Sequence, residues 1–139
     1  MTDTAPAARP VLEPAAQAFV EATANPPYLY DLTPDEARKV LDDVQATPID
    51  KPAADDQWVT VPAEVGDVRV RIVRPQGATH TLPVILYMHG GAFLTCGVNS
   101  HNRIVTTLST AADAPVLVVN YRMIPKHTVG MAVDDCRDA

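Results

Sequence analysis

Residues Leu82–Phe93 read LPVILYMHGGAF, and this stretch decides the fold. Its apolar run, residues 84–88, is short, contains β-branched and aromatic members, and stops at His89 and two glycines. Such a run is more typical of a strand buried on both faces than of a helix. Two glycines directly after the strand allow a sharp turn that brings backbone N–H groups close to a small group. The stretch therefore predicts a buried strand followed by a turn that can hold an anion.

The composition narrows the classes of partner. The chain has 139 residues, enough for one modest domain. Its formal net charge of −6 at pH 7 disfavours nucleic acid or an anionic membrane surface as partner. Arg69, Arg71 and Arg74 are the nearest approach to a basic cluster, and their alternation along one predicted strand indicates a solvated face. No apolar run approaches the ~18 residues that a membrane span requires.

Two further features bear on the compartment. The N-terminus lacks the charged and then apolar pattern of a signal peptide. The two cysteines, Cys96 and Cys136, are too few for a disulfide framework and fit a reducing environment. We therefore expect a cytoplasmic location.

The first third of the chain has helical periodicity. Apolar residues spaced three and four apart from Leu12 onward predict a helix that runs to about Ala24. Thr33 begins a second helix, in which Glu36 completes a capping box, and this helix should end near Ala46. The predicted organisation is a tail at residues 1–10, a helical segment at 11–47, a linker at 48–56 and an α/β core at 57–139.

Within the core the periodicity changes to two. Trp58–Val61 and Val68–Val73 alternate apolar with polar residues, which predicts an antiparallel hairpin with one wet face. After the glycine turn, a helix capped by Asn99 or Ser100 leads to a second apolar strand at Val116–Val119. Strand, helix and strand with short connections predict a βαβ unit with two parallel strands, and a last helix should start near residue 130.

Two motifs resemble those of a known family. HGGAF, His89–Phe93, resembles the His-Gly-Gly-Gly signature of the hormone-sensitive-lipase-like esterases and lipases, a branch of the α/β hydrolases. One helix and one strand later, NYRMIPKH at Asn120–His127, followed by DDC at Asp134–Cys136, resembles that family's Asp-Tyr-Arg-Leu-Ala-Pro-Glu-His and Glu-Asp-Cys block. The two N-terminal helices resemble the family's cap segment, and the hairpin resembles its first two strands. The resemblance implies an α/β fold, the incomplete N-terminal part of an α/β hydrolase, that acts on small-molecule esters without cofactor or metal.

The resemblance also implies roles within the turn. The backbone N–H groups of Gly91 and Ala92 would form an oxyanion hole, Gly90 would supply the turn, and His89 would anchor the loop by hydrogen bonding rather than act as the base. Ala92 stands where the family has its third glycine, and it costs little if its φ is negative. From the two glycines alone, a tight turn that needs glycine only for its geometry is the simpler interpretation.

A nucleophile of the family type is missing from the sequence. None of the six glycines brackets a serine in a Gly-x-Ser-x-Gly elbow, and Ser100 and Ser109 fall on or just before the helix after the turn. We therefore expect the N-terminal portion of an esterase, inactive as this chain alone. The alternatives are a pseudoenzyme or fragment that binds a small acyl or carboxylate ligand at the turn, and a frameshift product.

Other features have simpler interpretations. A thiol–histidine pair of Cys96 with His89 or His101 is less expected than packing, and the four histidines lack metal-ligand spacing. Asp134-Asp135 is expected as the solvated flank of a helix. If the family strand order applies, the strand at residues 84–88 leaves an open apolar edge, which favours aggregation or a second chain that completes the sheet.

Overall fold

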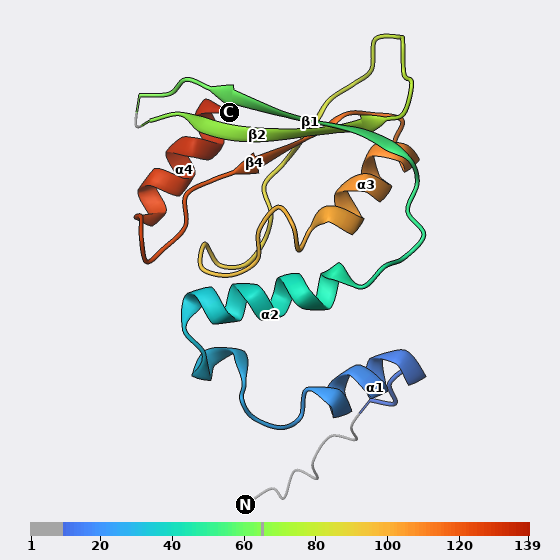
Figure 1. Ribbon diagram of the computed structural model, residues 1–139, viewed down its shortest axis with the longest axis vertical. Coiled ribbons are helices and arrows are strands. Elements are labelled where there is room, and N and C mark those ends of the chain that lie inside the picture. The colour runs from blue at the N-terminus through green and yellow to red at the C-terminus, as the bar shows by residue number, and fades with distance from the viewer. Residues whose placement is uncertain (1–9, 65) are drawn as a thin grey trace, which may run out of the picture. The chain divides into compact units, whose positions relative to one another are not determined.

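The computed structural model of the protein describes residues 10–64 and 66–139, which fall into two compact units divided between Leu32 and Thr33 (Figure 1). The N-terminal unit contains α1 (Pro14–Ala22) and a single 3₁₀ turn, η1 (Leu29–Asp31). Helix α1 ends two residues earlier than its apolar pattern predicts, and it has no buried residue. The predicted tail lies outside the described residues, apart from Pro10.

The C-terminal unit begins with the predicted capping box. The Thr33 N–H donates to Glu36 Oε2 at 2.9 Å, and the Glu36 N–H donates to Thr33 Oγ1 at 3.4 Å. These two bonds satisfy N–H groups that have no partner inside the helix. Helix α2 accordingly spans Pro34–Ala46, as predicted, and Ala37 is its buried residue.

The sheet has four strands in the order β1-β2-β4-β3. The predicted hairpin and the predicted parallel βαβ unit are both confirmed, and an antiparallel β2–β4 pairing joins them. Strand β1 begins at Ala54, so the segment expected as a linker ends three residues sooner than the sequence predicts. The strands are β1 (Ala54–Val61), β2 (Val68–Pro75), β3 (Ile85–Tyr87) and β4 (Val116–Asn120).

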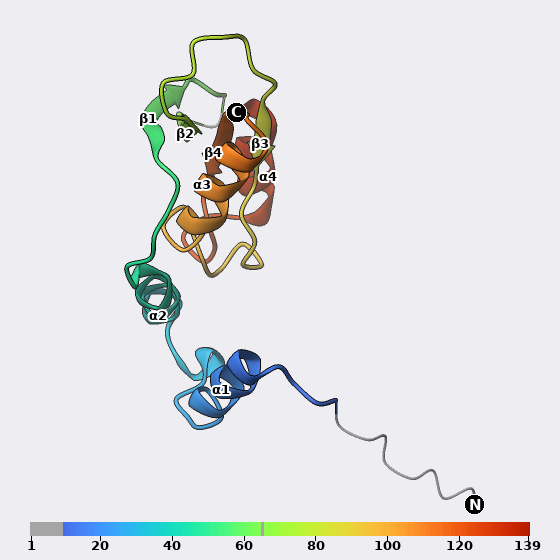
Figure 2. The same ribbon diagram turned by 90° about the vertical axis from the view of Figure 1, so that its right-hand side faces the viewer.

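Two helices cover the two faces of this sheet (Figures 1 and 2). Helix α3 (Asn102–Ala111) packs on one face, where Val105 meets Val116 and Val118. Helix α4 (Val129–Asp138) packs on the other, where Ala132 meets Val119. The predicted cap of α3 is wrong: His101 precedes the helix without a side-chain cap bond, because the Ser100 hydroxyl instead bonds the N–H and the carbonyl of Gly97.

Strand β3 is less buried than predicted. Ile85 and Tyr87 pack on the α3 side, but the Leu86 residue, which points to the other face, is 46% exposed. Burial on both faces is therefore wrong for the described chain. The reason is position: β3 lies at the edge of the sheet, with β4 on one side and no described strand on the other (Figure 2).

Candidate functional site

The turn after β3 is too tight for any side chain at its centre. Gly91 has φ +124°, and a Cβ there would lie 2.0 Å from the carbonyl oxygen of Thr95. The Gly91 carbonyl accepts hydrogen bonds from the N–H groups of Leu94, at 3.0 Å, and Thr95, at 2.8 Å. Gly90 has no positive φ and open space around it. The steric requirement for glycine therefore falls at Gly91, whereas the family resemblance implied that Gly90 supplies the turn.

Ala92 does not meet the condition under which it would cost little. Its φ is +52°, and Phe93 follows at +59°, so two residues with side chains adopt left-handed backbone in succession. Such a conformation costs a non-glycine residue roughly 1–2 kcal/mol. The turn therefore holds strained backbone directly after the glycine.

The two N–H groups predicted as donors find no acceptor within the described part of the chain. Among the described residues, neither the Gly91 nor the Ala92 N–H donates a hydrogen bond. Both residues line a mostly apolar pocket of about 360 Å³. Backbone N–H groups in folded proteins are normally paired, so two adjacent unpaired donors beside a pocket are available to a ligand. The other residues around this pocket are Met88, His89, Gly90, Phe93, Tyr121, Val133 and Cys136.

His89 is enclosed at the base of the turn. It is 4% exposed, and its ring stacks on that of Tyr121 with centroids 4.3 Å apart. Its Nδ1 lies 2.9 Å from the Gly90 carbonyl oxygen, which can only accept, so Nδ1 carries the proton. The buried Nε2 has no partner among the described residues. Burial lowers the pKa of His89, and the imidazole is therefore neutral at pH 7.

Tyr121 connects this histidine to the end of β4. Its hydroxyl donates to the His89 carbonyl oxygen at 2.6 Å and lies 3.1 Å from His89 Nδ1. Burial raises the pKa of Tyr121 to about 12, so this hydroxyl keeps its proton at pH 7. The Tyr121 hydroxyl and the His89 ring together fix the backbone at the start of the turn.

Asp135 corrects the prediction that Asp134-Asp135 is a solvated flank. Asp135 is 1% exposed and pairs with the Arg122 guanidinium, and it also accepts from the Arg122 N–H at 2.8 Å. Burial alone would raise the pKa of Asp135, but its hydrogen bonds to Arg122 outweigh burial and lower it. The signal missed in the sequence is spacing, since Asp135 lies three residues after Ala132, on the face of α4 that packs on the sheet.

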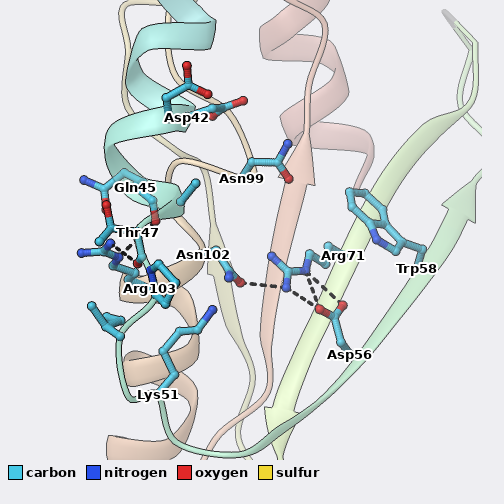
Figure 3. Close-up of a pocket in the computed structure, with 14 residues that line it drawn as sticks. Asp42, Gln45, Thr47, Lys51, Asp56, Trp58, Arg71, Asn99, Asn102 and Arg103 are labelled. Atoms are coloured by element: carbon cyan, nitrogen blue, oxygen red, sulfur yellow. Dashed lines mark hydrogen bonds and ion pairs between the residues drawn. The ribbon is translucent and has the colours of Figure 1, made fainter.

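A larger pocket, of about 710 Å³, lies away from the turn between α2, the hairpin and α3 (Figure 3). Arg71, expected on a solvated face, is half-buried here. Its side chain is 12% exposed, pairs with Asp56 and donates to the Asn102 amide oxygen at 2.9 Å. Arg103 donates to the carbonyls of Gln45 and Thr47. Arg103 thus joins α3 to the end of α2, and Arg71 joins the hairpin to α3. No nucleophile–base pair lines this pocket in the described chain.

The weaker candidates gain no geometric support. Cys96 makes no hydrogen bond to a described histidine. The rings of His89 and His101 lie near each other, with centroids 5.5 Å apart. No group of three or more His, Cys, Asp or Glu side chains within residues 10–64 and 66–139 is placed to hold a metal ion. In the same residues, no helix has the length and apolar character needed to cross a membrane.

Comparisons with known proteins point to one class. Residues 85–139 match the sequence model of the family described as alpha/beta hydrolase fold. Esterase LipU of Mycobacterium tuberculosis is 61% identical over 71 residues, 49% of this chain and 24% of that protein. A putative alpha/beta hydrolase of Acanthamoeba polyphaga mimivirus is 31% identical over 128 residues, 92% of this chain and 36% of that protein.

A solved structure extends the match to nearly the whole chain. A thermostable esterase from Pseudomonas putida superimposes with a TM-score of 0.87 at 27% identity, covering 95% of this chain and 42% of that one. The architecture is therefore that of the N-terminal part of an α/β-hydrolase esterase. The resemblance to the hormone-sensitive-lipase-like branch is confirmed, and the chain spans well under half the length of these relatives.

Proposed function

We propose that the turn at His89–Phe93 is the oxyanion hole of a carboxylic ester hydrolase, with the N–H groups of Gly91 and Ala92 as its donors. The observation that carries the proposal is that both N–H groups are unpaired within the described chain, beside an apolar pocket. His89 and Gly90 would shape and anchor this turn. His89 would not act as the base, because its unprotonated Nε2 is buried and has no hydrogen-bond partner among the described residues.

The chemistry fits these donors. Acyl transfer places negative charge on the carbonyl oxygen in the tetrahedral transition state, and one fixed donor to that oxygen contributes roughly 3–4 kcal/mol. The strained backbone of residues 91–93 holds the donors before the substrate arrives, so little reorganisation accompanies the reaction. The apolar walls of the pocket suit the ester substrate's carbon chain.

Hydrolysis would need a nucleophile from elsewhere. The sequence has no Gly-x-Ser-x-Gly elbow, and both of its serines are engaged. Ser109 is buried and donates to the Val73 carbonyl at 3.1 Å, while Ser100 bonds Gly97. The chain alone should therefore be inactive, and a polypeptide that pairs with the free side of β3 is the natural source of the missing groups.

A second function follows from the same geometry. Two N–H groups that are unpaired within the described chain, beside a pocket that no serine lines, would bind a small carboxylate or acyl ligand without cleaving it. This is the non-catalytic alternative, and it uses Gly91 and Ala92 in the same way.

Hydrolysis of p-nitrophenyl acetate separates these functions. The 139-residue chain should give no turnover above buffer. A longer polypeptide that includes a downstream Gly-x-Ser-x-Gly, if the genomic sequence encodes one, should be active and sensitive to a serine-directed inhibitor. Inhibitor-sensitive turnover by the chain alone would contradict the proposal that its nucleophile lies elsewhere. An inactive longer polypeptide would favour the binding function.

A further inference from the structure

The Arg38 side chain of helix α2 bonds to the turn. The Arg38 guanidinium reaches across to two loops that are distant in the sequence: Nε donates to the Leu94 carbonyl at 2.9 Å, and Nη2 donates to the Ile124 carbonyl at 2.7 Å. Its Nη1 donates to Asp35 Oδ1 at 2.7 Å, one turn earlier on the same helix. The side chain is 17% exposed, so most of the group is shielded from water.

The two carbonyls belong to the loops that follow the two parallel strands. Leu94 lies in the turn after β3, and its N–H donates to the Gly91 carbonyl. Ile124 lies in the loop after β4, and its N–H donates to the Phe93 carbonyl at 3.0 Å. The two loops are thus linked directly by one bond and indirectly through the arginine.

We propose that Arg38 is a positioning residue that holds the Gly91–Ala92 N–H groups in place by binding the backbone on the far side of the turn. Ala92 and Phe93 are the strained part of the turn. Leu94 follows them: its N–H donates to the Gly91 carbonyl, and its own carbonyl accepts from Arg38. A planar guanidinium suits this role, because each of the three acceptors meets a different nitrogen, whereas a lysine would have to reach all three from a single nitrogen. The inference rests on the proposed oxyanion function of the same turn.

Residue-specific amide hydrogen exchange in the 139-residue chain tests the inference without a ligand. In Arg38→Ala, exchange of the Leu94, Thr95 and Ile124 N–H groups should speed up about tenfold, which matches the net loss of one to two hydrogen bonds. Exchange at Val70 and Val118, in the sheet, should change less than twofold. Arg38→Lys, which keeps the charge and is the gentler change, should show the same local pattern. Asp35→Asn is the matched control, since it removes the ion pair with Arg38, and the longer one with Lys126 at 3.9 Å, and leaves both carbonyl contacts.

Acetate then links position to function. Acetate affinity, followed by the shifts of the Gly91 and Ala92 amides, should weaken about threefold or more in Arg38→Ala and Arg38→Lys and stay unchanged in Asp35→Asn. Equal acceleration of exchange at the turn and in the sheet, in both arginine variants, would overturn the inference, because it would show a general contribution to stability. If acetate shifts neither amide in the unsubstituted chain, the oxyanion function fails, while the exchange pattern still decides whether Arg38 holds the turn.

Discussion

The loops that follow β3 and β4 leave the carboxyl ends of two parallel strands, but they differ in whether their polar groups are paired. The loop after β4 has its polar groups paired: the Tyr121 hydroxyl, the Arg122 guanidinium and the Ile124 N–H all bond to the protein. The turn after β3 has positive φ at three successive residues, and two of its N–H groups are unpaired among residues 10–64 and 66–139. The loop after β4 holds the β3 turn in place, and the β3 turn presents the N–H donors. We therefore expect substitutions in the β4 loop to act mainly on stability, and those in the β3 turn to act on ligand binding.

The largest loss of stability should come from a substitution at Asp135, which binds the loop after β4. Asp135→Ala removes the carboxylate that accepts from the backbone N–H and the side chain of Arg122. Breaking a buried ion pair in this way should lower the free energy of unfolding by about 3–5 kcal/mol. Urea denaturation followed by circular dichroism measures it. Asp134→Ala, at the half-buried neighbouring residue, is the control and should change stability by less than about 1 kcal/mol.

The same pair gives the chain an acid dependence. Because the pKa of Asp135 is lowered in the folded state, its contribution to stability is complete above the ordinary value of 3.8 and is lost as the pH falls through the folded pKa. Unfolding measured from pH 6 to pH 2 should show this loss, and Asp135→Ala should lack that part of it. An identical acid profile in the variant would contradict the assigned role.

A substitution at Gly91, in the turn after β3, should cause the next largest loss of stability. Gly91→Ala places a Cβ against the Thr95 carbonyl and forces a positive φ on a side-chain-bearing residue, so we expect a cost of about 2–4 kcal/mol and loss of acetate binding. Gly90→Ala is the matched control, because open space and ordinary φ should hold its cost to about 1 kcal/mol or less. Equal costs at the two glycines would show that the turn is not built as described.

Loss of the hydrogen bond between Tyr121 and His89, which joins the two loops, should lower stability by an intermediate amount. Tyr121→Phe removes the hydroxyl that donates to the His89 carbonyl and leaves that buried oxygen without this partner. The expected loss is about 1–2 kcal/mol in urea denaturation. Tyr30→Phe, in the exposed part of the N-terminal unit, should change nothing measurable.

The smallest change in stability should come from Ala92, the residue that stands where the family signature has its third glycine. Ala92→Gly relieves left-handed strain of roughly 1–2 kcal/mol but adds the greater chain entropy of glycine, about 0.5–1 kcal/mol. The net result should be a gain in stability of about 0.5 kcal/mol. A loss of stability would mean that the methyl group of Ala92 packs favourably enough to offset its backbone strain.

Local patterns in the sequence predicted much of the fold and less of the site. The Thr33 capping box, the alternating hairpin and the βαβ unit follow from periodicity and turn chemistry, and all three are present. The misses depend on tertiary context. Burial of Leu86 depends on a neighbouring strand. The ion pairs of Arg71 and Asp135 depend on partners 15 and 13 residues away, which no short-range pattern identifies. The positive φ of Ala92 and the reach of Arg38 to Leu94 likewise emerge only in the folded chain.

The central claim is that Gly91 and Ala92 offer two free N–H groups to an anionic oxygen. Titration of the ¹⁵N-labelled chain with sodium acetate at constant ionic strength tests it directly, since the carboxylate oxygen stands in for the transition-state oxyanion. We predict that the Gly91 and Ala92 amide protons shift downfield more than any others, saturably and together, and that Gly91→Ala abolishes the response. Acetate that leaves these two amides unmoved, or shifts them no more than the amides of the sheet, would contradict the claim.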